Sequence, residues 1–204
     1  MPAHRLILAS ASPRRRQLLA EAGYAFAVEP ADVDEDAFVG RVDPHDLPRR
    51  LAEVKADAVA ARHAGEPVVV LAADTVVYSA LGEVLNKPRD RDDARRMMRT
   101  LSGTLHRVVT GYCAVRCDDP ARRRSGAVRS DVLMRPLGDA EVEAYLDTGE
   151  WTGKAGGYGI QDTPGKAIGA GDLFIESITG ELTNIVGLPM PQVIDALEEL
   201  GVRR

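Results

Sequence analysis

Basic side chains gather at a position where a phosphate-bearing ligand could be held. The stretch LILASASPRRRQLLAEAG (6–23) places Arg14, Arg15 and Arg16 directly after Ser-Pro, in the first turn of an expected helix. A helix N-terminus has free backbone N–H groups and a partial positive charge, which favours acidic side chains there. The arginines are therefore explained if a highly charged anion binds at this turn, and a solvated basic helix face is the alternative.

A lysine and a carboxylate form a second set of candidates. Asp74 ends the apolar run PVVVLAAD, where a carboxylate could hold Mg²⁺ or orient a water molecule. Lys55 falls inside the apolar stripe of an expected helix, so it either reaches the edge of that helix or points into a polar cleft. The structural alternative for Asp74 is a cap or turn residue.

Further candidates lie in expected loops. Glu35, in the acidic stretch ADVDED, could be a second carboxylate for a metal, although a solvated loop is the simpler interpretation. Lys87 precedes Pro88 in a turn. In the glycine-rich stretch GKAGGYGIQD, Lys154 lies among flexible residues that could approach a ligand closely, and the Gln161 amide could bind a base edge. Together these residues make an inventory for a triphosphate and a metal ion.

Alternating strands and helices are expected to position these side chains. Apolar runs predict strands over 6–8, 67–74, 108–115, 128–134 and 173–178. Periodic apolar positions predict helices over 13–22, 46–64, 90–101, 139–146 and 191–200. The run at 67–74 is typical of a strand covered on both faces, and 116–126 is expected to be an exposed loop with arginines at its tip. The pattern predicts an α/β fold with a mixed, twisted sheet and flanking helices.

Composition excludes several classes of protein. The 204 residues suffice for one domain or for two closely joined lobes, and the net charge of −5 argues against general binding to nucleic acid or membranes. The longest apolar run, 68–73, is too short to span a bilayer, and without a secretory signal we expect a cytoplasmic protein. Cys113 and Cys117 would be roughly 13 Å apart in a strand, too far to bridge, and lack the spacing of a zinc site.

Seven motifs occur in series between Leu6 and Pro189: SASPRR, AEVKA, AADTVV, NKP, LSGTLHRVVTG, GKAGGYGIQ and VGLP. In this order and spacing the chain resembles the Maf family of nucleoside triphosphate pyrophosphatases. The resemblance implies one domain over 1–204, with two lobes around a central cleft, similar to the inosine triphosphate pyrophosphatases. It also implies cleavage between the α- and β-phosphates with Mg²⁺ or Mn²⁺, giving a nucleoside monophosphate and pyrophosphate.

The resemblance also assigns roles to residues. Asp74 corresponds to the proton acceptor and, with Glu35, is a candidate metal ligand. The positions expected to bind phosphate are Ser10, Ser12, Arg15, Lys55 and Lys87. The positions expected to select the base are Arg14, Thr75 and Gln161, and they match the subgroup that prefers dTTP and UTP over 7-methyl-GTP. One departure is Asp162, where the family usually has glycine, so base selectivity or affinity could differ here.

Two other functions stay open. One is a nucleotide-binding regulator of septum formation or cell division that need not turn over its ligand. The other is a pyrophosphatase for 7-methyl-GTP or non-canonical purine triphosphates. Intact Asp74, Lys55 and Lys87 favour an enzyme, because a pure binder needs no general base. We expect a nucleoside triphosphate as substrate and no nucleic-acid or membrane partner, and a homodimer is left open.

Overall fold

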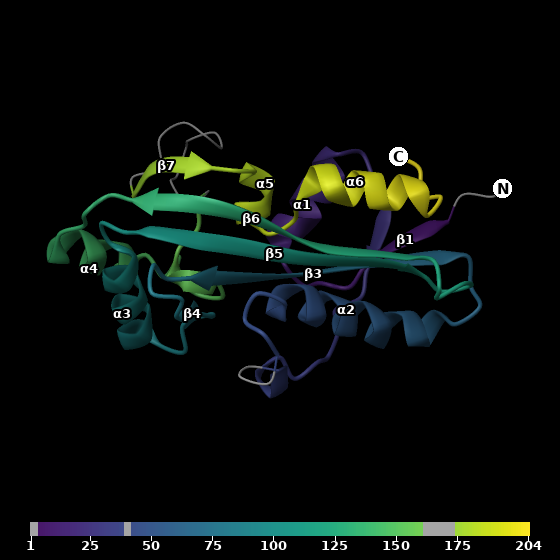
Figure 1. The fold of residues 1–204 in the computed structure, drawn as a ribbon, viewed down its shortest axis with the longest axis horizontal. Helices are drawn as coiled ribbons and strands as arrows, with labels where there is room; N and C mark the ends of the chain where they lie inside the picture. Colours follow the sequence, from purple (N-terminus) through teal and green to yellow (C-terminus); the bar gives the residue numbers. More distant parts are fainter. Residues whose placement is uncertain (1–3, 39–41, 161–173) are drawn as a thin grey trace. The chain divides into compact units, whose positions relative to one another are not determined.

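The computed structural model describes residues 4–38, 42–160 and 174–204 (Figure 1). Its strands are β1 (Arg5–Leu8), β2 (Phe26–Val28), β3 (Val68–Tyr78), β4 (Val84–Leu85), β5 (Leu105–Arg116), β6 (Arg123–Met134) and β7 (Ile175–Thr179). Its helices are α1 (Pro13–Glu21), α2 (Leu47–Ala60), α3 (Arg91–Leu101), α4 (Asp139–Asp147), α5 (Leu182–Val186) and α6 (Met190–Glu199). Short 3₁₀ helices cover Asp36–Phe38, Ala61–His63 and Ala155–Gly157. No helix within the described ranges is long and apolar enough to cross a membrane.

The strands of the described residues form one mixed sheet. Its order is β2-β1-β3-β5-β6-β7, with β4 paired to β3 outside this path. β1 is parallel to β2 and β3, whereas β4 is antiparallel to β3 and β7 is antiparallel to β6. Parallel neighbours need crossover connections, which α1 and α2 supply. The predicted α/β class with a mixed sheet is confirmed.

The register between β1 and β3 determines which side chains can meet. Leu8, the last residue of β1, pairs with Leu71, and the Ala9 backbone N–H donates to the Leu71 carbonyl over 2.8 Å. The end of β1 therefore lies level with a residue of β3 that is three positions before Asp74. Sheet pairing thus brings Ser10 towards the level of Asp74, although the two residues are distant in sequence.

The chain divides into two compact units, each with its own apolar core. The first contains Met1–Asp74, Thr110–Val128 and Gly187–Arg204. In it, α2 presents Ala52, Ala56 and Val59 to one face of the sheet, at the spacing of one helix face. Val69 and Leu71, which alternate with the residues of that face along β3, are fully buried as well. The prediction that this strand is covered on both faces is therefore confirmed.

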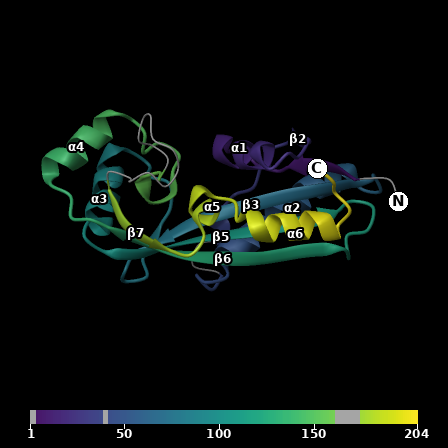
Figure 2. The same cartoon turned by 90° about the horizontal axis from the view of Figure 1, so that it is seen from above.

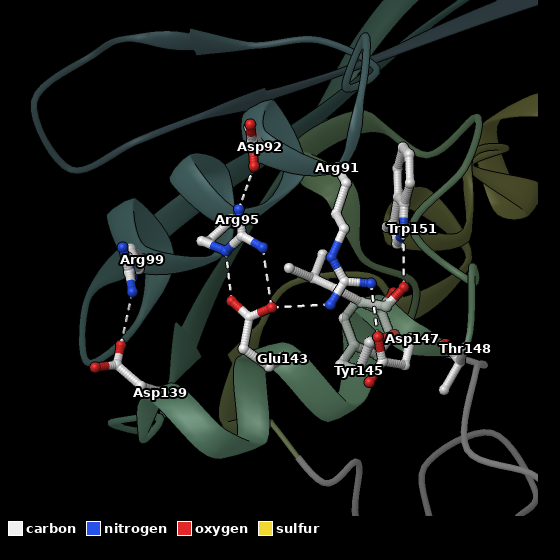
Figure 3. Close-up of polar contacts among 11 residues, drawn as sticks. Arg91, Asp92, Arg95, Arg99, Asp139, Glu143, Tyr145, Asp147, Thr148 and Trp151 are labelled. Carbon is white, nitrogen blue, oxygen red and sulfur yellow. Dashed lines mark hydrogen bonds and ion pairs between the residues drawn. The ribbon is translucent and has the colours of Figure 1, made fainter.

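The second unit contains Thr75–Val109 and Arg129–Val186. Its core includes Met97 and Met98 of α3 and Val142 of α4, so the methionine pair fills a core. Figures 1 and 2 both show α3 beside α4. Across this contact Glu143 of α4 accepts hydrogen bonds from Arg91 and Arg95 of α3 (Figure 3). Partly exposed ion pairs contribute little individually, so the apolar contacts decide the pairing of these helices.

Several predicted strand boundaries are wrong, and one of them is the start of β5, which lies at Leu105 instead of residue 108. β3 does not end at Asp74 but continues to Tyr78, because Val76 and Val77 are buried and the last two residues of the strand pair with β4. β6 begins at Arg123, within the segment expected to be a loop. Its first arginines are therefore not a solvated loop tip.

Side-chain contacts confirm that correction. Arg123 donates to Asp57 of α2 over 2.7 Å, and Arg124 forms an ion pair with Glu199 of α6. Two other short elements, α5 and the 3₁₀ helix within the glycine-rich stretch, were not expected from the sequence.

Both cysteines are buried and free, as expected. Cys113 lies in β5 and Cys117 directly follows that strand. Burial raises the pKa of the Cys113 thiol to about 12 and that of Cys117 to about 11. Neither thiol is therefore a reactive thiolate near neutral pH.

The start of α2 approaches β5 at Gly111, where no side chain fits. A Cβ atom at Gly111 would lie 2.2 Å from the backbone of Pro48. We expect Gly111→Ala to lower the free energy of unfolding by about 1–3 kcal/mol or more, as measured by urea denaturation. Gly138→Ala is the control, because its Cβ would have no neighbour closer than 3.7 Å. Equal stability losses in the two variants would contradict this account of the helix position.

Candidate active site

A buried ion pair between α2 and β3 forms the centre of the candidate site. The Lys55 Nζ donates to Asp74 Oδ1 over 2.6 Å, and each residue is only 7% exposed. Lys55 was expected either to reach the edge of its helix or to point into polar surroundings. The structure supports polar surroundings, because the ammonium contacts a carboxylate. Removing Lys55 from such a desolvated pair leaves the buried carboxylate of Asp74 without its closest counter-ion.

Glu35 provides a second carboxylate to the same lysine. Its Oε1 lies 2.7 Å from Lys55 Nζ, and 41% of its side chain is exposed. Glu35 comes from the acidic stretch that was most simply interpreted as a solvated loop, and that interpretation does not hold for this residue. The ammonium of Lys55 therefore contacts one buried carboxylate, Asp74, and one that is more exposed.

Arg15 is held by the turn between β1 and α1 and by a distant carbonyl. Ser12 is the N-cap of α1, and its hydroxyl accepts from the Arg15 backbone N–H over 3.5 Å. The Arg15 guanidinium donates from Nη1 to Ser10 Oγ over 3.1 Å and from Nε to the Gly187 carbonyl over 2.8 Å. Three of the predicted phosphate-binding residues, Ser10, Ser12 and Arg15, are thus in contact with one another.

Burial and charge shift the proton affinities of this cluster in opposite directions. Burial raises the pKa of the Asp74 carboxyl, and the nearby positive charges of Lys55 and Arg15 counteract that rise. Burial lowers the pKa of the Arg15 guanidinium, and the negative charge of Asp74 opposes this shift. A carboxylate removed from water but kept near cations has the properties of a general base.

The remaining predicted site residues are Arg14, Thr75, Lys87 and Gln161. Arg14 is half-buried, and its positive charge contributes to the lowered pKa of Arg15. Thr75, half-buried in β3, and Lys87, exposed after β4, belong to the second unit. Gln161 and the atypical Asp162 lie outside the described residues.

Lys154 has an acidic partner within its own unit. The residue is buried, and its Nζ lies 2.9 Å from Glu150 Oε2. Its place in a glycine-rich stretch suggested that it approaches a ligand. The structure shows an ion pair with a neighbour four positions away in sequence, and the approach to a ligand stays a prediction.

The described part of the chain contains no group of three or more His, Cys, Asp or Glu side chains that could hold a metal ion. The two predicted ligands, Asp74 and Glu35, do meet at one point, because each lies within 2.7 Å of Lys55 Nζ. The two carboxylates therefore stabilise a positive charge between them, which is the ammonium of Lys55.

Comparison with known proteins identifies the family. The model of the family described as Maf-like protein matches residues 5–200. The chain belongs to this family. A relative of this Maf-like protein in Anaeromyxobacter dehalogenans (strain 2CP-C), named dTTP/UTP pyrophosphatase, is 46% identical over 200 residues, which cover 98% of this chain and 95% of the relative.

Other organisms have relatives of the same name. The dTTP/UTP pyrophosphatase of Geobacter sulfurreducens is 44% identical to this Maf-like protein over 201 residues, covering 97% of each chain. That of Pyrococcus horikoshii is 40% identical over 198 residues, again covering 97% of each. The predicted family membership is confirmed.

Gly187 is the residue of this Maf-like site that the sequence did not reveal. Its carbonyl binds Arg15 across 172 positions of the chain. The only signal that could have pointed to it is the VGLP motif, which no local pattern connects with Arg15.

Proposed function

We infer that this Maf-like protein is a nucleoside triphosphate pyrophosphatase that hydrolyses dTTP and UTP to the nucleoside monophosphate and pyrophosphate. The observation that carries this inference is the name dTTP/UTP pyrophosphatase shared by relatives 40–46% identical over nearly the whole chain. The cluster of Arg15, Lys55 and Asp74 supports it, because a polyanion needs cations and hydrolysis needs a base.

The reaction follows from these groups. A water molecule attacks the α-phosphorus, the bond from the α-phosphorus to the oxygen bridging it to the β-phosphorus breaks, and pyrophosphate leaves with that electron pair. Asp74 accepts the proton of the attacking water, and its raised pKa makes it a stronger base than an exposed aspartate. Arg15 and Lys55 offset the negative charge of the phosphates. Further phosphate contacts are proposed for Ser10, Ser12 and Lys87.

A divalent cation, Mg²⁺ or Mn²⁺, fits the donor set at Asp74 and Glu35. Protein sites for Mg²⁺ often use only one or two carboxylates together with substrate phosphates, so a third protein ligand is not required. Both carboxylates contact the ammonium of Lys55, so they lie close enough together to share a cation that would bind beside that ammonium. When bound, the cation would neutralise part of the triphosphate charge.

A screen for pyrophosphate release tests this function. The full chain is assayed with dTTP, UTP, 7-methyl-GTP, dITP, XTP and the other canonical triphosphates, with Mg²⁺ or Mn²⁺. We expect the highest kcat/KM with dTTP and UTP. Nucleotide binding without release of pyrophosphate from any substrate would instead favour a regulator of septum formation or cell division, and fastest release from dITP or XTP would favour a purine triphosphate pyrophosphatase.

Base selection is attributed to Arg14, Thr75 and Gln161. A glutamine amide can pair with a pyrimidine edge, and a base that leaves this amide unpaired is rejected. We expect Gln161→Ala to narrow the kcat/KM advantage of dTTP over 7-methyl-GTP by about 3- to 10-fold, the effect of about one hydrogen bond. Faster hydrolysis of 7-methyl-GTP by the unmodified protein would contradict the assignment. Asp162→Gly would then show whether this atypical residue is responsible.

A further inference from the structure

The VGLP motif has a direct contact with the candidate active site. Neither the proposed general base nor the proposed metal ligands involve this motif. Yet the Gly187 carbonyl accepts a hydrogen bond from Arg15 Nε over 2.8 Å. A second guanidinium contact, from Nη1 to Ser10 Oγ, measures 3.1 Å. Two contacts at different nitrogens fix both the position and the plane of a rigid guanidinium.

We propose that Gly187 is a positioning residue, whose carbonyl holds the Arg15 guanidinium in the orientation that receives the triphosphate. The inference rests on the proposed function, because it assigns Arg15 to phosphate binding. Gly187 itself would not touch the substrate. It would act through Arg15, by having the side chain ordered before the ligand arrives.

The backbone around Gly187 is suited to this task. Its φ angle is 118°, a region that residues with a Cβ atom rarely adopt. Gly187 is buried, the next residue, Leu188, is fully buried, and Pro189 follows immediately before α6. The Pro189 carbonyl in turn accepts from the Val193 backbone N–H over 3.0 Å within α6. The carbonyl that orients Arg15 is therefore placed by a buried and hydrogen-bonded backbone.

The chemistry of the acceptors also matters. A carbonyl oxygen and a hydroxyl oxygen are neutral, so the contacts with Gly187 and Ser10 orient the guanidinium, while the negative charges that act on it come from Asp74 and Glu35. Burial lowers the pKa of the Arg15 guanidinium, because a charge away from water is less well solvated. A polyanion that reaches such a charge gains more from it than it would in water, provided that the guanidinium is already oriented.

A double-mutant cycle tests whether Gly187 acts through Arg15. The variants are Gly187→Ala, Arg15→Ala and both together. The probe is α,β-methylene-dTTP, which keeps the triphosphate charge but resists cleavage between the α- and β-phosphates. We expect Gly187→Ala to weaken binding of this probe by about 10- to 100-fold, and to weaken it no further when Arg15 is already alanine.

A matched glycine separates positioning from general strain. Gly65 lies in the same unit, has a φ of 82°, and would place a Cβ with no neighbour within 4 Å. Gly65→Ala should therefore introduce backbone strain but leave binding of the probe unchanged. The proposal is overturned if Gly187→Ala binds the probe as Gly65→Ala does, or if the losses caused by Gly187→Ala and Arg15→Ala add.

A measurement on the unmodified protein covers the case in which Gly187→Ala does not fold. The Arg15 Nε–H, assigned in NMR spectra by its loss in Arg15→Lys, should exchange with solvent more slowly than that of the exposed Arg16, even without nucleotide. Equal exchange rates would overturn the proposal. Failure of the proposed function has a different signature, because the unmodified protein would then release no pyrophosphate from any triphosphate, or would release it fastest from a purine triphosphate.

Discussion

Replacing Asp74 with asparagine is expected to lower kcat for dTTP by about 10²–10⁴-fold, the usual contribution of a positioned general base. Asparagine has the shape of aspartate but cannot accept the proton of the attacking water. It also removes the negative charge that meets Lys55 Nζ at 2.6 Å. Pyrophosphate release under saturating dTTP and metal measures the effect, and a thermal melt confirms that the variant is folded.

A second buried aspartate provides the control for that experiment. Asp93 is 9% exposed and binds Arg96 Nη2 over 3.0 Å within the second unit. Asp93→Asn removes a comparable charge and is expected to lower the melting temperature while leaving kcat nearly unchanged. Near-normal turnover by a folded Asp74→Asn variant would reject the role of Asp74 as the base.

Replacing Lys55 with methionine is expected to affect both stability and the pH profile. The variant retains the apolar stem but leaves the carboxylate of Asp74 buried without its closest counter-ion. When the carboxylate stays ionised, this should lower the free energy of unfolding by about 3–5 kcal/mol. Lys55 is 7% exposed, so solvent cannot replace the lost ammonium.

The exposed Lys87 should differ in this respect, since its replacement is expected to weaken nucleotide binding with little effect on stability.

The sign of the pH effect follows from Asp74. Burial already raises the pKa of this carboxyl, and Lys55 opposes the rise. Without Lys55 the pKa rises further, so the acid limb of kcat/KM should move to higher pH. A group with a raised folded-state pKa binds more protons in the folded state, so the stability deficit of Lys55→Met should shrink as the pH falls.

Urea denaturation between about pH 5 and 8 and the pH profile for dTTP measure these two effects. The double variant Lys55→Met with Asp74→Asn is the control, because it leaves neither charge of the pair unmatched. It should recover part of the lost stability but none of the activity. An unchanged acid limb in Lys55→Met would show that the ammonium does not control the base.

The sequence alone determined the local elements and the family. Helices over 90–101 and 139–146 were predicted within one residue of α3 and α4, because period and capping are properties of neighbouring residues. The mixed α/β class followed from alternating apolar runs. The motifs in series indicated the Maf family. Local patterns selected Asp74 and Lys55 as candidates, and the resemblance supplied their roles as proton acceptor and phosphate-binding residue.

Only the tertiary structure decided how these residues meet. The contact of Lys55 with Asp74 spans 19 positions, and that of Arg15 with Gly187 spans 172. Such contacts depend on the register of neighbouring strands and on how helices cross them, which local periodicity does not encode. The same limit explains why the sequence predicts that this strand ends at Asp74, since the continuation of β3 to Tyr78 depends on pairing with β4. The amino-acid pattern thus supplied the chemical groups, and long-range backbone pairing and burial decided which of them share one environment.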